Sequence, residues 1–129
     1  MREATIILPR HAVAERELER DLLRYFGGFS RQPITGSWIN DKTGERYDDD
    51  STLYTVAMEV TGGNASRLYT LARDAGLASG QITVYVRQAD GKVEFADTGL
   101  SRGEPNPRET VAMDERILAY RQDHILPPL

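Results

Sequence analysis

Cysteine is absent from the 129-residue chain, so disulfides, thiolate metal sites and cysteine nucleophiles are excluded. Long apolar runs are also missing, and none approaches the roughly 20 residues that a membrane-spanning helix needs. Charged side chains occur throughout the first 30 residues, which leaves no apolar segment typical of a secretory signal. We therefore expect a cytoplasmic protein without a membrane partner.

An excess of positive charge is lacking as well. The formal net charge is −4 and the isoelectric point is about 5.2, whereas proteins that bind nucleic acids generally present a cationic face. The chain contains no Walker or G-x-G-x-x-G pattern, no RNA-binding aromatic pattern and no nucleophile elbow. The composition therefore argues against a nucleic-acid partner, and no cofactor is predicted.

The hydrophobic content of 40% is enough for one core, and its spacing predicts the elements of a single domain. Residues 4–9 form a β-branched run that ends in proline, which is typical of a strand. Residues 12–26 repeat apolar side chains at helical spacing, and Gly27 follows where a glycine commonly ends a helix. Two further strands, joined by a tight turn, are predicted over residues 34–40 and 45–60.

The second half of the domain repeats the helix and strand signals. A second helix, capped by Asn64 or Ser66, is predicted to end at Gly76. Alternating apolar residues predict a strand over residues 82–86. An Asp-Gly pair, the strongest hairpin signal in the chain, then leads into a last strand over residues 93–95.

The predicted order β-α-β-β-α-β plus one added strand is that of the ferredoxin-like plait, an α+β fold also called the split βαβ. Four strands would pair in the order 4-1-3-2, with both helices on one face and the fifth strand beside strand four. We predict this domain over residues 1–98, a linker over residues 99–107, and a C-terminal helix and tail over residues 108–129. The apolar tail would cover the bare sheet face or pack on a partner subunit.

A histidine and several carboxylates are predicted to meet at one edge of the sheet. Strands one and three are neighbours, so His11 should approach Asp48 and Asp50. A histidine beside carboxylates can perform acid–base catalysis or bind a metal. The alternative is a solvated turn in which Arg10 pairs with an aspartate and the charges discourage edge pairing. We take His11, Asp48 and Asp50 as candidate catalytic residues and predict no metal ion.

Glycine-rich turns are predicted to meet at the opposite edge. Gly62, Gly63 and Asn64 lie between a strand and a helix, where free backbone N–H groups and the helix dipole favour an anion. Arg31 could add positive charge to this candidate anion-binding site. The alternative is that the glycines only form a tight turn.

The sole tryptophan, Trp38, lies in the first strand of the predicted 34–60 hairpin. Aromatic side chains dominate cores and interfaces by their buried area, so we predict that Trp38 anchors the hairpin in the core or in a subunit interface. Together with Ile117 and Leu118 of the tail, it is the predicted interface of a homodimer.

A short pattern adds a resemblance. Residues 25–29 read Tyr-Phe-Gly-Gly-Phe, and Gly36, Trp38 and Gly44 follow. This FGG…GxW…G pattern resembles small uncharacterised bacterial, phage or plasmid proteins. The resemblance covers roughly residues 4–98, implies the ferredoxin-like plait, and implies no established activity.

The sequence leaves three functional interpretations. The main interpretation is a non-catalytic interaction or ligand-binding module, such as an inhibitor or accessory protein of a mobile element, acting on a protein partner or a small ligand. The alternative is a small cofactor-free enzyme of the isomerase or lyase type, using a His–Asp pair in a cleft at a dimer interface. The third is an anion or nucleotide sensor at the edge with the paired glycines.

Overall fold

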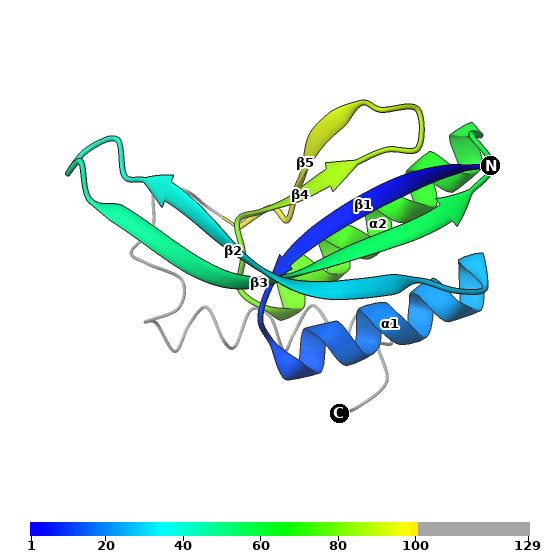
Figure 1. Ribbon diagram of the computed structural model, residues 1–129, viewed down its shortest axis with the longest axis horizontal. Coiled ribbons are helices and arrows are strands. Elements are labelled where there is room, and N and C mark those ends of the chain that lie inside the picture. The colour runs from blue at the N-terminus through cyan, green and yellow to red at the C-terminus, as the bar shows by residue number, and fades with distance from the viewer. Residues whose placement is uncertain (101–129) are drawn as a thin grey trace.

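A five-stranded antiparallel sheet with two helices forms the part of the chain that the computed structural model describes, residues 1–100 (Figure 1). The elements are β1 (Arg2–Pro9), α1 (Ala12–Phe26), β2 (Ser30–Ile39), β3 (Arg46–Met58), α2 (Gly62–Ala78), β4 (Thr83–Arg87) and β5 (Val93–Asp97). The strand order is β2-β3-β1-β4-β5, which is the predicted order 4-1-3-2 with the added strand beside strand four. The predicted C-terminal helix and tail, residues 108–129, lie outside the described residues.

Alternation along the strands places the core between the sheet and the helices. In β1, Ala4, Ile6 and Leu8 are fully buried, while the residues between them are partly exposed. Helix α2 packs against β1, β4 and β5, and α1 packs against α2 and β3. On the other face of the sheet, Val93 and Phe95 remain exposed among the described residues. Neither of these helices has the length and apolar character needed to cross a membrane.

Helix α1 has the predicted bounds. His11 is its N-cap, and the following helix turns bury Leu18 and Leu22 against the core. The chain leaves the helix at Gly27 with φ of 82°, a left-handed conformation that glycine adopts without steric cost.

Helix α2 departs from the prediction at both ends. Its N-cap is Thr61, whose hydroxyl accepts a hydrogen bond from Asn64 N, so neither Asn64 nor Ser66 is the cap. The helix continues past Gly76, where we expected it to end. A Cβ atom on Gly76 would overlap Val84 Cγ2 of β4, so this glycine allows the helix to lie close to the sheet.

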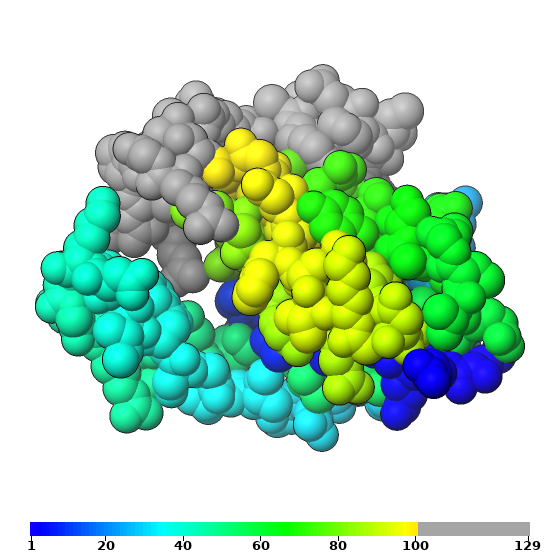
Figure 2. All heavy atoms as spheres, turned by 90° about the horizontal axis from the view of Figure 1, so that it is seen from above, coloured from blue at the N-terminus to red at the C-terminus, as the bar shows by residue number. Residues whose placement is uncertain are grey.

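The β2–β3 hairpin extends beyond the rest of the sheet. β1 pairs with β3 only from Ser51 to Met58, so the part that we call the arm, residues 35–50, is a ribbon of two strands and their turn. Figure 1 shows this ribbon leaving the body of the domain. Figure 2 shows the arm, in cyan, separated from the β4–β5 hairpin, in yellow, by open space.

Candidate functional site

A polar network, here called the α1 cluster, joins α1 to β2 and β3. Its members are Glu15, Glu19, Arg31, Thr52 and Tyr54. Thr52 donates a hydrogen bond of 2.6 Å to Glu15 Oε1, and the Tyr54 hydroxyl donates one of 2.7 Å to Glu19 Oε2. Arg31 Nη1 donates to the same Glu19 oxygen over 2.5 Å. Because Glu15 and Glu19 lie four residues apart, one face of the helix presents both carboxylates to the strands.

Tyr54 is the most deeply buried member of the α1 cluster. Its exposed fraction is zero, and its ring meets Phe29 edge to face at a centroid distance of 5.7 Å. Burial raises the pKa of Tyr54 well above its ordinary value of 10.0, and the hydrogen bond to Glu19 raises it further. Tyr54 is therefore a hydrogen-bond donor at neutral pH. With their donors and acceptors paired, these residues tie α1 to β3.

His11, the predicted catalytic histidine, serves the start of α1. Its Nδ1 accepts a hydrogen bond of 3.1 Å from Ala14 N, and its own backbone N–H donates to Glu15 Oε2 over 2.9 Å. The first of these bonds requires that Nδ1 has no hydrogen, so the neutral ring carries its hydrogen on Nε2. His11 can therefore donate from Nε2, but it cannot take up a proton at Nδ1 while it caps the helix.

Asp50, one of the two candidate aspartates, lies on β3 beside the end of β1 that leads into His11. Arg10 N donates a hydrogen bond of 3.0 Å to Asp50 O, which places the backbone of Asp50 beside the start of α1. The Arg10 side chain pairs with Glu15 at 3.8 Å and not with an aspartate. No group of three or more His, Asp or Glu side chains suitable for a metal ion occurs within residues 1–100.

Asp48 lies farther out on the arm. Its Oδ1 accepts hydrogen bonds from Ser37 Oγ at 2.7 Å and from Arg46 Nε at 3.1 Å. Both residues of this ion pair are largely exposed, so the pair contributes little to stability. The structure therefore places Asp50 near His11 and leaves Asp48 in a local network of the hairpin.

Trp38 also lies on the arm, where it is not part of a core of the described residues, and its place in a subunit interface stays a prediction. Its exposed fraction is 49%. The indole ring stacks on Tyr47 at a centroid distance of 4.6 Å, and Nε1 donates to Asp49 Oδ2 over 2.9 Å. The arm extends past β1, so the sheet offers no core there. The other predicted interface residues, Ile117 and Leu118, lie outside the described residues.

Two residues of the candidate anion site, Asn64 and Arg31, form hydrogen bonds with other parts of the chain. Gly62, Gly63 and Asn64 form the first turn of α2, where the Asn64 side chain donates to Glu59 O over 2.9 Å. Arg31 lies on β2 and pairs with Glu19 of α1, which raises the pKa of the guanidinium. Its ion-pair partner is thus a carboxylate of the α1 cluster.

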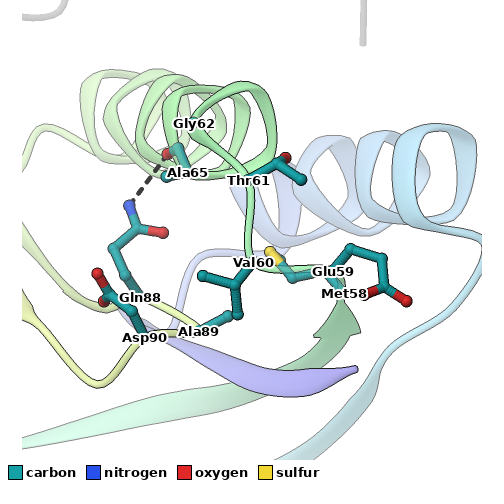
Figure 3. A pocket seen from close by; sticks show the side chains of 9 residues that line it. All are labelled: Met58, Glu59, Val60, Thr61, Gly62, Ala65, Gln88, Ala89 and Asp90. Carbon is teal, nitrogen blue, oxygen red and sulfur yellow. Dashed lines mark hydrogen bonds between the residues drawn. The ribbon is translucent and has the colours of Figure 1, made fainter.

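A pocket of about 200 Å³ lies at the start of α2, and we call it the end pocket. It is lined by Met58, Glu59, Val60, Thr61, Gly62, Ala65, Gln88, Ala89 and Asp90 (Figure 3). Sequence reasoning did not identify Gln88, which is only 5% exposed. The sequence does contain a signal for Gln88. It follows Val84 and Val86 at every second position, on the buried face of the sheet, where a polar side chain is unusual.

The α1 cluster lies at the middle of β3, and the end pocket lies where this strand ends. Thr52, which belongs to the α1 cluster, lies six residues before Met58 at the end pocket, and a strand rises by about 3.3 Å per residue. The two places are therefore about 20 Å apart, and one small molecule of ordinary size does not bridge them.

Comparison with known proteins gives a fold relationship. No protein-family model matches the chain, and no curated protein is significantly similar to it in sequence. The structure is similar to that of a phage SAM lyase in complex with S-methyl-5'-thioadenosine, with a TM-score of 0.60 and 12% identity over 78% of this chain and 92% of that chain. It is likewise similar to a phage SAM lyase in the apo state, with a TM-score of 0.59 and 14% identity over 78% of this chain and 91% of the other.

These similarities correct the main functional interpretation. A non-catalytic interaction module was the first expectation from the sequence, but both solved structures are those of an enzyme. The alternative, a small enzyme of the isomerase or lyase type, agrees better with them. The chain shares its fold with phage SAM lyases.

Proposed function

We propose that the chain is a lyase that cleaves S-adenosylmethionine and releases S-methyl-5'-thioadenosine. The observation that carries this proposal is the similarity in fold to the phage SAM lyase, which extends over 92% of that enzyme's chain. The phage source of both similar structures also agrees with an origin in a mobile element.

The chemistry of this reaction makes modest demands on side chains. The bond between the sulfonium sulfur and the aminobutyrate chain breaks, and the electron pair stays on sulfur, which becomes neutral. A lyase adds no water, so the vacated carbon is satisfied either by closure onto the substrate's own carboxylate or by loss of a neighbouring proton. Since charge disappears as the bond breaks, a site that excludes water and orients the substrate favours the transition state.

We place the reaction at the base of the arm, with His11 and Asp50 as its polar residues. The Nε2 hydrogen of His11 is suited to bind the substrate carboxylate, and Asp50 is suited to attract the cationic end. The tautomer of His11 supports a binding role and not that of a general base. Asp48, the other candidate, would act on the approach to the site from its position on the arm.

The test is to incubate the purified chain with S-adenosylmethionine and to measure S-methyl-5'-thioadenosine by liquid chromatography and mass spectrometry. In water labelled with oxygen-18, the carbon product of a lyase should form without the label before any later hydrolysis. His11→Asn replaces the capping Nδ1 with an amide oxygen that can also cap the helix. This variant should lower kcat/KM, as should Asp50→Asn. Asp21→Asn, a change on α1 at a side chain that pairs with Arg20 and lies outside the proposed site, is the matched control. Formation of product no faster than in buffer alone would contradict the proposal.

We also propose that the fold is the ferredoxin-like plait and that the chain forms a homodimer. The element order and the strand order support the plait. Exposed apolar residues support association, since Val93 is 49% exposed and Phe95 61% exposed on the sheet face without helices, and Trp38 and Ile39 are exposed on the arm. A site at the base of the arm would then lie close to the subunit interface. Sedimentation velocity tests this expectation.

A further inference from the structure

The side-chain oxygen of Gln88 is a buried acceptor without a donor. Gln88 is 5% exposed, and its Oε1 has no hydrogen-bond partner. Figure 3 shows the amide at the wall of the end pocket, with the oxygen turned toward the space between Val60 and the start of α2. A buried carbonyl left unpaired is costly to a fold, so this oxygen marks a place where a ligand donor would be favourable.

The orientation of the Gln88 amide follows from its neighbours. Nε2 donates to Ala65 O over 3.0 Å and to Glu94 Oε2 over 2.9 Å. Both partners are hydrogen-bond acceptors. If the amide were turned over, Oε1 would face these two oxygen atoms and no hydrogen bond could form. The group that faces the pocket is therefore the oxygen, and it requires an N–H or O–H donor.

The other walls of the end pocket define the body of the ligand. Met58, Val60, Ala65 and Ala89 supply apolar surface, and the two charged residues among the lining are the acids Glu59 and Asp90. These acids disfavour a phosphate inside the pocket. A charged ammonium would lose much of its hydration against the apolar walls. A neutral, flat group that carries an N–H donor fits this lining best.

The start of α2 adds a donor to the same space. The first bond of the helix runs from Ala65 N to Thr61 O, and Asn64 N is bound by the Thr61 hydroxyl. Gly62 lines the pocket and is the first residue of α2, so its N–H has no acceptor in the hydrogen-bond ladder of the helix. The pocket thus offers one acceptor and one donor, a pair that matches an aromatic amine next to a ring nitrogen.

We infer that the end pocket binds the 6-aminopurine edge of an adenosine compound, with the exocyclic amine donating to Gln88 Oε1 and a ring nitrogen accepting from Gly62 N. The volume of about 200 Å³ is below the roughly 300–1,000 Å³ of most ligand pockets. It therefore holds the base, and the sugar lies outside. This site goes beyond the proposed lyase reaction, which we place at the base of the arm.

A second hollow indicates where the rest of the ligand lies. It shares Ala89 and Asp90 with the end pocket, is more open, and adds the acid Glu3 and the cations Arg2 and Arg87. These two cations would favour a ligand with phosphate groups, such as AMP, over S-methyl-5'-thioadenosine, which has none. Tighter binding of AMP than of S-methyl-5'-thioadenosine would indicate that the natural ligand is a nucleotide. The reverse order would indicate the product of the proposed reaction.

The experiment is isothermal titration calorimetry of the full chain with adenosine, inosine, AMP and S-methyl-5'-thioadenosine. Inosine has a carbonyl oxygen where adenosine has its amine, so it would face Gln88 Oε1 with a second acceptor. We expect inosine to bind about 10- to 100-fold more weakly than adenosine, the range for one buried polar group left unpaired. Equal binding of adenosine and inosine would overturn the inference, as would the absence of binding by every adenosine compound.

Two variants locate the site. Gln88→Met removes the acceptor with little change in volume, and exposed Gln32→Met on β2 is its chemical match. Ala65→Leu fills the pocket from α2 and leaves the backbone bond to Gln88 in place. Both pocket variants should reduce adenosine binding at least 10-fold, with Gln32→Met unchanged and cooperative thermal unfolding retained in all three. Unchanged adenosine binding in Ala65→Leu would place the ligand elsewhere and overturn the inference. Lyase activity measured in the same variants should stay unchanged, so failure of one proposal leaves the other testable.

Discussion

Replacing Gly76 with alanine tests how closely α2 lies against the sheet. In an open helix this change stabilises by about 1 kcal/mol, because alanine has the higher helix propensity. At Gly76 the new Cβ would overlap Val84 Cγ2 and lie 3.0 Å from Thr98 Cγ2. Val84 is 1% exposed, and a β-branched side chain has few alternative rotamers. The helix and the strand would therefore have to move apart.

The expected magnitude follows from these opposing effects. Overpacking of a well-packed core costs about 1–3 kcal/mol, and the rigid neighbours place Gly76 near the upper end of that range. After the gain in helix propensity, we expect a net loss of about 2 kcal/mol in the free energy of unfolding. For a domain of this size that is a decrease in Tm of roughly 8–16 °C.

The assay is urea denaturation followed by circular dichroism, together with a thermal scan. Gly63→Ala is the matched control, since nothing lies within 4 Å of a Cβ built there, and it should be neutral or slightly stabilising. In a Val84→Ala background the Gly76→Ala penalty should largely disappear, because the overlapping methyl group is gone. If Gly76→Ala is as stable as the parent chain, α2 does not lie as close to β4 as the structure has it.

Two further predictions concern tyrosine and tryptophan. Because the pKa of Tyr54 is raised in the folded state, this tyrosine ionises first in the unfolded chain. The contribution of Tyr54 to the free energy of unfolding should be complete below about pH 10 and should fall as the pH rises above it. In urea denaturation between pH 8 and pH 11, the free energy of unfolding of Tyr54→Phe should fall less steeply than that of the parent chain, and equal slopes would refute the assignment. In dilute solution the fluorescence of Trp38, which is 49% exposed, should have its maximum at long wavelength and should be quenched by acrylamide. If the chain dimerises through the arm, this maximum should shift to shorter wavelength as the protein concentration rises. A maximum independent of concentration would place the interface elsewhere.

The sheet was predictable because its local signals agree with one another. The helical spacing and terminal glycine of α1 gave its bounds, and the turn at Gly91, with φ of 95°, gave the last hairpin. The strand order then follows from the usual arrangement of a βαβ-ββαβ chain.

The departures arose where the outcome depends on contacts distant in sequence. Gly76 has the same local signal as a helix-ending glycine, and only the approach of β4 reveals its role. Thr61, Asn64 and Ser66 are all good capping residues, and the hydrogen bond from Asn64 N to the Thr61 hydroxyl starts the helix at Gly62. A core was one of the two places expected for Trp38, because aromatic residues dominate cores and interfaces, but the arm extends beyond β1, where the sheet has no core.

Of the candidate site, the proximity of Asp50 to the start of α1 was predictable from the pairing of strands one and three. The end pocket was not, because Gln88, Ala65 and Gly62 come from segments whose approach depends on the packing of α2 across the sheet. A polar residue among inward-facing valines indicates an exception to the pattern. It does not indicate what the exception is for.

The central position of β1 has a consequence for the order of folding. This first strand lies in the middle of the sheet, where Thr5 pairs with Thr55 on one side and with Arg87 on the other. The second pairing closes a loop of about eighty residues, and long-range closures of this kind slow folding. During synthesis, one edge of β1 therefore stays uncovered until β4, about eighty residues later, has left the ribosome.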